Sequence, residues 1–155
     1  MKLHTLLGLS ILGLVVVAAC SKNYDSKPSL KVLSLSTDLV QVNEPLTIHL
    51  EYTDKEGDFD SIWVKKVRVN MRKPQNTLRD SFWLKLSDEA PNNKKGLIDL
   101  VLDYNNYVVS ANPPLTDLSG PGKEPDSLIF KIVLKDKKRN FSDTVSTGRV
   151  VVVRQ

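Results

Sequence analysis

The chain predicts a single all-β domain, and three observations predict it. In the segments 46–52 and 128–134, apolar and polar residues alternate, which places one face of each strand in a core and the other in water. Turn-forming residues separate such segments along the chain. Helical periodicity is almost absent. About seven short strands in one domain of this size favour an Ig-like antiparallel β-sandwich.

The alternation defines the expected strands in chain order. The first two are residues 30–36 and 46–53, and the third covers 62–71. The remaining strands are expected at 80–86, 97–104, 128–134 and 144–153. Segments rich in Pro and Asn lie between them, at 43–45, 73–76 and 90–93. These positions suit turns rather than sheet interiors.

The third strand is irregular. Ile62 and Val64 share one parity, whereas Val67, Val69 and Met71 share the other. A β-bulge near the intervening lysine pair would bring both sets into the core. Alternatively, the side chain of Trp63 points inward and that of Ile62 does not.

The first nineteen residues differ from the rest. Lys2 gives a positive start, residues 6–17 are almost continuously apolar, and small residues precede Cys20. This order is typical of a secretory signal. A transmembrane helix is the alternative, but a span needs about 20 apolar residues and this run is shorter.

The segment Val17-Ala18-Ala19-Cys20 resembles the lipobox of bacterial lipoproteins. The resemblance implies lipidation of Cys20, cleavage before it, and membrane attachment through the acyl chains. Two or more chains anchor firmly because each buried CH₂ contributes about 0.8 kcal/mol. We therefore expect a signal peptide at 1–19, a flexible tether at 20–28 and the sandwich domain at 29–155. The alternative is an ordinary signal followed by an unmodified thiol.

An acidic turn follows the second expected strand. It contains Asp54, Glu56, Asp58 and Asp60, with Gly57 among them. Carboxylates at alternate positions suit Ca²⁺, which takes six to eight oxygen ligands. In an Ig-like topology, the loop that contains Asp136 lies at the same end of the sandwich. These five acids are the candidate calcium ligands.

The alternative for this turn is neutralisation without a metal. Lys137, Lys138 and Arg139 lie in the loop next to Asp136, and they supply positive charge for ion pairs. The run also lacks the spacing of an EF-hand. An acidic, Gly-containing surface turn therefore remains open beside the calcium site.

The longest irregular segment covers residues 105–126 and contains four prolines. Long loops in compact domains are often functional. Tyr104 and Tyr107 are its candidate binding residues, as part of an apolar patch. Alternatively, they pack over a sheet edge or form a short additional strand.

Composition argues against most catalysis. The only cysteine is the lipidation candidate, and His49 is the only histidine outside the signal peptide. Zinc sites and Cys–His nucleophiles are therefore not expected, and no nucleotide-binding or hydrolase motif occurs. A hydrolase that uses carboxylates alone is a further alternative, although solvated acids lack the raised pKa of a general acid.

Charge argues against a nucleic-acid partner. Cleavage removes Lys2 from the 22 basic residues and none of the 18 acidic ones. The small positive charge that remains is too weak for an electrostatic nucleic-acid footprint, and export argues against such a partner independently.

Several segments together resemble small lipoproteins of Bacteroidetes-type bacteria. They are the lipobox, the turn 53–58, the segment 61–66 and the closing segment 134–147. The resemblance implies a lipoprotein with an Ig-like domain and no assigned activity. Only one acid, Asp25, closely follows Cys20, and this favours the periplasmic face of the outer membrane over the cell surface.

The sequence therefore predicts a lipid-anchored, non-catalytic binding or assembly module of the cell envelope. Its expected partners are the membrane and an envelope protein or glycan. A calcium-stabilised structural spacer is the main alternative function.

Overall fold

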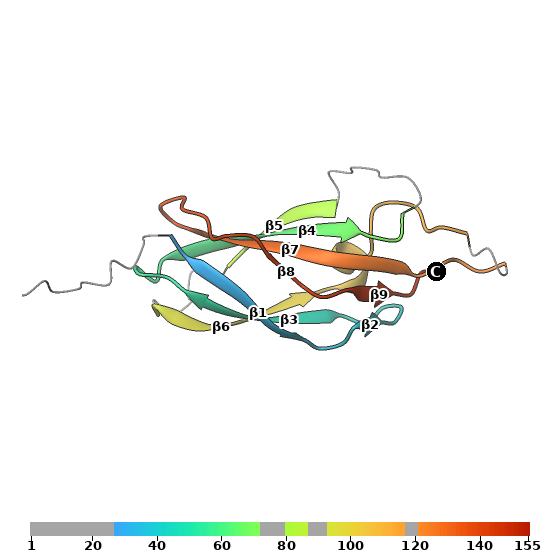
Figure 1. The fold of residues 1–155 in the computed structure, drawn as a ribbon, viewed down its shortest axis with the longest axis horizontal. Coiled ribbons are helices and arrows are strands. Elements are labelled where there is room, and N and C mark those ends of the chain that lie inside the picture. The colour runs from blue at the N-terminus through green and yellow to red at the C-terminus, as the bar shows by residue number, and fades with distance from the viewer. Residues whose placement is uncertain (1–26, 72–79, 87–92, 117–120) are drawn as a thin grey trace, which may run out of the picture.

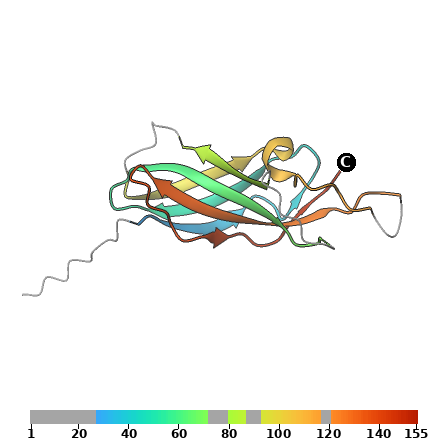
Figure 2. The same cartoon turned by 90° about the horizontal axis from the view of Figure 1, so that it is seen from above.

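The described part of the protein is a sandwich of two packed β-sheets (Figure 1). The computed structural model describes residues 27–71, 80–86, 93–116 and 121–155. Viewed from above, the long strands of both sheets run along the length of the molecule (Figure 2). The expectation of an all-β sandwich is confirmed.

Nine strands and one helical turn form within the described residues. The strands are β1 (Ser29–Leu35), β2 (Leu39–Val40), β3 (Leu46–Thr53), β4 (Phe59–Arg68), β5 (Ser81–Lys85), β6 (Lys95–Leu102), β7 (Asp126–Asp136), β8 (Val145–Ser146) and β9 (Val150–Val152). The helical element is a single π-helical turn, Tyr104–Val108, which follows β6. No helix in the described segments has the length and apolar character needed to cross a membrane.

The strand order is that of an Ig-like sandwich. One sheet has the order β1-β3-β6, and the other has the order β2-β9-β7-β4-β5, with β8 also beside β7. The pairs are antiparallel except for β2 and β9, which are parallel. The β3–β4 loop and the β7–β8 loop consequently lie at the same end, where the amide of Lys137 donates to the carbonyl of Asp58 at 2.8 Å. We call this end the loop end.

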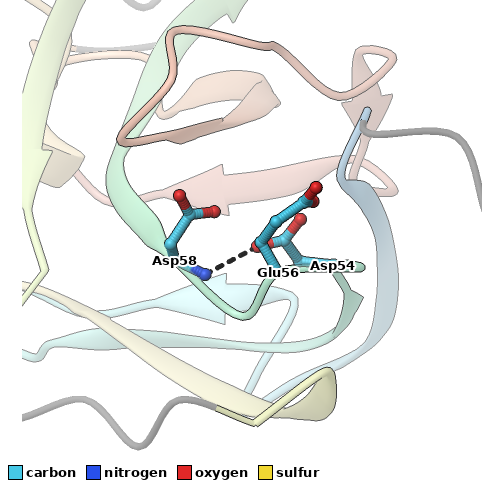
Figure 3. A group of neighbouring side chains, drawn as sticks. All are labelled: Asp54, Glu56 and Asp58. Carbon is cyan, nitrogen blue, oxygen red and sulfur yellow. Dashed lines mark hydrogen bonds between the residues drawn. The ribbon is translucent and has the colours of Figure 1, made fainter.

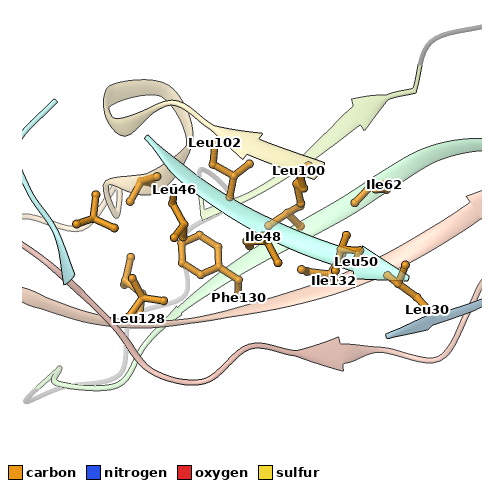
Figure 4. Packing of buried hydrophobic residues seen from close by; sticks show 14 of the residues in the cluster. Leu30, Leu46, Ile48, Leu50, Ile62, Leu100, Leu102, Leu128, Phe130 and Ile132 are labelled. Atoms are coloured by element: carbon orange, nitrogen blue, oxygen red, sulfur yellow. The ribbon is translucent and has the colours of Figure 1, made fainter. Parts of the chain in front are cut away.

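The core lies between the sheets and comes from the even-numbered residues of the long strands. Strand β3 contributes Leu46, Ile48 and Leu50, and β7 contributes Phe130 and Ile132 from the opposite sheet (Figure 4). These side chains are essentially inaccessible to water. Burial of such apolar residues is the main stabilising contribution to the fold.

The expectation for the third strand is wrong. Strand β4 keeps one parity from Ile62 to Arg68, and its register shift lies at its start, between Phe59 and Ser61. Trp63 lies on the solvent-facing side, and Val69 is also exposed. The inward positions after Val64 are instead Lys66 and Arg68, both of which are buried.

The two inward cations are buried because acids meet them there. The Arg68 guanidinium lies 2.7 Å from one oxygen of Asp126, and the Arg154 guanidinium lies 2.6 Å from the other. The ammonium of Lys66 donates to the carbonyl of Val109 and lies 3.5 Å from Asp80. From sequence alternation, the inward positions of a strand are expected to hold apolar residues. The ion pairs with acids from distant segments explain why charged residues occupy them here.

We predict that Asp126→Asn lowers the free energy of unfolding by about 3–5 kcal/mol. The substitution leaves two buried guanidinium groups without a counter-charge. Urea unfolding of the variant measures the change. Glu51→Gln is the matched control, because Glu51 pairs with Lys95 at 3.0 Å on the surface, where such a pair contributes about 0–1 kcal/mol. A loss at Asp126 no larger than that of the control would contradict the prediction.

Candidate metal centre

In two core strands, every second residue points into the core, and this row of inward residues ends with an acid at the loop end. In β3 the row runs through Leu50 and Tyr52 and reaches Asp54, and in β7 it runs through Ile132 and Leu134 and reaches Asp136. Asp54 is only 2% exposed and Asp136 is 0% exposed. Strand periodicity therefore places two carboxylates where the core ends.

Gly57 turns the chain so that two further carboxylates join Asp54. Its φ of 71° lies in the left-handed region, which glycine adopts without steric cost. The flanking residues Glu56 and Asp58 then direct their side chains toward Asp54 (Figure 3). One carboxylate oxygen from each of these three residues lies within 4.8 Å of the other two. We call this group the acidic triad.

Each member of the triad has a buried oxygen without a hydrogen-bond partner among the described residues. These atoms are Asp54 Oδ1, Glu56 Oε2 and Asp58 Oδ1. Buried polar atoms normally have a hydrogen-bond partner or bind an ion, so we expect a partner for each of these three oxygens. Three neighbouring carboxylates that each have an unpartnered oxygen fit a hard cation with oxygen ligands.

The hydrogen bonds around the triad fix its geometry. The Asp58 amide donates to Asp54 Oδ2 at 2.8 Å. Both oxygens of Asp136 accept from Asn140, one from the backbone amide and one from the side-chain amide, each at 2.7 Å. Asp136 therefore lies beside the triad as a buried negative charge, with its oxygens already hydrogen-bonded.

Few of the cations at the loop end form an ion pair with the triad. Lys138 lies 3.3 Å from Glu56 Oε1, and this is the one ion pair to the triad that the described residues show. Lys137 contributes a backbone amide, and its side chain is exposed. Ion pairing, the alternative to a metal, thus reaches Glu56 and leaves the carboxylates of Asp54 and Asp58 without a cation.

The pKa of Asp54 is raised above its ordinary value of 3.8. The main cause is burial, which disfavours the charged carboxylate, and the nearby charges of Asp58 and Asp136 raise the pKa further. The hydrogen bond from the Asp58 amide opposes the shift. A divalent cation would reverse this balance by favouring the ionised form.

A cavity of about 480 Å³ opens next to Asp54. Its lining residues are Lys27, Ser29, Thr53, Asp54, Lys55, Lys94 and Lys95. Two of its four lysines are already paired, Lys27 with Asp143 at 2.7 Å and Lys95 with Glu51 at 3.0 Å. The cavity therefore places Lys55 and Lys94, as well as the two paired lysines, next to Asp54.

The other candidate residues lie elsewhere. Asp60 accepts hydrogen bonds from Ser61 and from Lys135, so it is outside the triad. Tyr104 is buried, and its hydroxyl donates to the carbonyl of Val153 at 2.6 Å. Tyr107 packs on Phe82, with ring centres 4.8 Å apart. The two tyrosines thus belong to the π-helical turn, where Tyr104 is part of the core cluster and Tyr107 packs against it. Cys20 lies outside the described residues.

The sequence did not predict two groups of residues that the structure brings together. The charged network around Asp126 gives no local signal, since its partners come from four separate segments. Trp63 and Trp83 form the other group, directly opposite each other on β4 and β5. Each tryptophan lies two residues before a lysine, Lys65 or Lys85, and so shares its face of the strand. This spacing could have predicted that the tryptophans point outward.

Comparisons with known proteins assign no family. No protein-family model matches the chain, and no curated protein matches it. Among solved structures, the sporulation control protein Spo0M of Bacillus subtilis is similar, with a TM-score of 0.49 and 12% identity over 84% of this chain and 51% of that chain.

Two β-glucosidases are also similar in structure. That of Listeria innocua, in complex with glucose, gives a TM-score of 0.43 and 14% identity over 83% of this chain and 16% of its own. That of Erythrobacter marinus gives 0.44 and 11% identity over 82% of this chain and 15% of its own. The chain thus spans about half of Spo0M and less than a fifth of either glucosidase, and no activity follows from these similarities.

We predict that Asp54→Asn stabilises the metal-free protein near neutral pH. A carboxyl whose folded pKa exceeds its unfolded pKa loses stabilising free energy as the pH rises from 3.8 through the raised value. Asparagine removes this loss and can still accept from the Asp58 amide. Urea unfolding in EDTA across a pH series should show an advantage for the variant above that window and none below it.

The matched control is Asp38→Asn, because Asp38 is exposed and lies just before β2, outside the loop that carries the triad. This variant should follow the unchanged protein at every pH. A lower stability of Asp54→Asn in EDTA at neutral pH would contradict the electrostatic description of the triad.

Proposed function

We propose that the protein is a lipid-anchored, non-catalytic module of the cell envelope whose loop end binds Ca²⁺. The observation that carries the proposal is the acidic triad, in which three carboxylates lie together and each has a buried oxygen without a hydrogen-bond partner among the described residues. The donor set supports calcium because it consists of carboxylates alone. Histidine and thiolate ligands, which favour transition metals, are missing from the triad.

The two ends of β7 offer an internal comparison. At its start, buried Asp126 has two guanidinium partners at 2.6–2.7 Å. At its end, buried Asp136 lies near the triad, which has one ion pair with a lysine among the described residues. Burial of a charge without a counter-charge costs free energy. A bound cation at the end of β7 would supply the positive charge that the two arginines supply at its start.

A cation at the triad would join parts of the chain that are distant in sequence. The β3–β4 loop supplies the ligands and contacts the β7–β8 loop through the Lys137 amide. Strand β1 begins beside the end of β3, where Ser29 is opposite Thr53. The described chain therefore enters the sandwich at the loop end, and calcium would stiffen the point at which the expected tether meets the domain.

The surroundings of His49, the one histidine outside the expected signal peptide, support a non-catalytic role. His49 lies on the outer face of the β1-β3-β6 sheet, and its Nδ1 is 2.7 Å from Asp99. Both side chains are open to solvent. Ser34 is opposite His49 in the β1–β3 pairing, but the described hydrogen bonds of the imidazole include Asp99 and not the Ser34 hydroxyl. A solvated pair of this kind has no pocket in which a substrate is held.

We predict that calcium raises the thermal unfolding midpoint of the purified protein and that EDTA reverses the rise. Binding to the folded state alone stabilises by about 2.7 kcal/mol at a hundredfold excess over Kd, which corresponds to roughly 10 °C for a domain of this size. Asp54→Asn and Asp58→Asn should abolish the response, whereas Asp38→Asn should retain it. A midpoint that calcium leaves unchanged would end the calcium proposal.

We also predict that Cys20 carries the membrane anchor. Its sequence context, Val17-Ala18-Ala19-Cys20, supports acylation, and two or more acyl chains give firm attachment. Cys20→Ser should move the protein from the membrane fraction to the soluble fraction of cells. Mass spectrometry of the N-terminal peptide should show the added acyl mass in the unchanged protein. An unmodified thiol there would contradict the anchor.

A further inference from the structure

Both tryptophans of the chain lie on the outer face of the larger sheet. Trp63 of β4 is directly opposite Trp83 of β5. Trp83 is 51% exposed, and the neighbouring Phe141 is 47% exposed. The rings of Trp83 and Phe141 lie 6.4 Å apart, centre to centre. The core cluster between the sheets does not include these rings, so the apolar surface that they form lies outside it.

The rings border a shallow hollow of about 370 Å³. It is lined by Trp63, Trp83, Val133, Phe141, Ser142 and Thr144. The floor belongs to strands β4, β5 and β7, which pair firmly, while Phe141 comes from the β7–β8 loop and is held by a bridge to Lys135. The hollow is thus a preformed surface with flat aromatic walls. We call it the aromatic groove.

A lysine-rich rim surrounds the groove. Lys65, Lys85, Lys131 and Lys135 have the same outward parity on β4, β5 and β7 as the groove residues. Lys135 lies 5.7 Å from the centre of the Trp83 ring and 3.2 Å from Asp60. Asp60 is the acid that the described residues place at this rim. Lys65 and Lys131 are therefore the rim cations on which the charge argument depends.

One pair in the rim is unfavourable for the protein by itself. Lys65 and Lys131 are directly opposite each other in the β4–β7 pairing, and both are exposed. Like charges at opposite positions destabilise a sheet. The described residues show no ion pair for either lysine. An anion between them would relieve the repulsion.

We propose that the aromatic groove binds an anionic polysaccharide, such as one built from uronic acids. The apolar C–H face of a pyranose ring stacks on the indole and phenyl rings, and its carboxylates meet Lys65 and Lys131. The fixed Asp60–Lys135 pair offers an acceptor and a donor to sugar hydroxyls. Flat rings supply contact area at small entropic cost, and the lysines supply the preference for charge.

This partner fits the groove better than a folded protein does. A stable protein interface buries about 800 Å² on each side around an apolar centre that is depleted of lysine. Here the aromatic surface is narrow and bordered by lysines on three strands. Single-stranded nucleic acid would also match rings and lysines, but the expected export of the chain disfavours it.

The two tryptophans allow a direct test, because the chain has no others. Purified protein is titrated with hexasaccharides of galacturonate, mannuronate and chondroitin, with neutral cellohexaose and with oligo-dT. We expect at least one anionic hexasaccharide to change the tryptophan emission and to shield it from acrylamide quenching. Affinity should fall as salt is added, and cellohexaose should bind more weakly.

Calorimetry on variants assigns the site. Trp83→Ala should weaken binding of the anionic hexasaccharide by about tenfold or more, and the pair Lys65→Gln with Lys131→Gln should remove the preference over cellohexaose. Leu97→Ala and Lys31→Gln change exposed residues of the other sheet and should leave affinity unchanged. Unfolding midpoints show that each variant is folded.

Three outcomes overturn the proposal. The first is an emission spectrum that no anionic hexasaccharide alters at millimolar concentration. The second is full affinity in the Trp83→Ala variant. The third is binding of oligo-dT or cellohexaose that equals or exceeds that of every anionic hexasaccharide. The groove shares no residue with the acidic triad, so these results are independent of the calcium test.

Discussion

The inward row of β7 sets the constraint on which the rest of the structure depends. It begins with Asp126, continues through apolar residues such as Phe130, and ends with Asp136, and both acids are fully buried. An acid at each end of an apolar core needs compensation by a cation or by hydrogen bonds. Arg68 and Arg154 meet that need at one end. At the other end, Asn140 supplies hydrogen bonds, and the acidic triad adds further negative charge.

This asymmetry connects the fold to the proposed function. The ion network around Asp126 closes one end of the sandwich with groups that the chain itself provides. The loop end gathers Asp54, Glu56 and Asp58, and the described residues supply one ion pair to this group, from Lys138 to Glu56. A protein released into a calcium-containing compartment can use the ion as its missing counter-charge. Under the proposed function, the loop end would acquire its full rigidity only after export.

The sequence predicted the sandwich because the long strands alternate cleanly, as Leu46–Thr53 does. It also placed the two loops at one end through Ig-like topology, and the contact between Lys137 and Asp58 confirms that expectation. It did not predict β2, because two residues carry no periodic pattern. It misjudged β4 because alternation assigns inward positions to apolar residues, whereas Lys66 and Arg68 are buried against acids contributed from distant segments. Such pairings are visible only in three dimensions.

The most direct test of the account is a crystal structure of the protein grown with calcium, with anomalous diffraction used to locate the ion. The account predicts one peak among Asp54, Glu56 and Asp58, with carboxylate oxygens about 2.3–2.6 Å from it. A map with no peak there, and with the Lys138 ammonium or ordered water between the carboxylates, would contradict the claim that a cation completes this end of the sandwich.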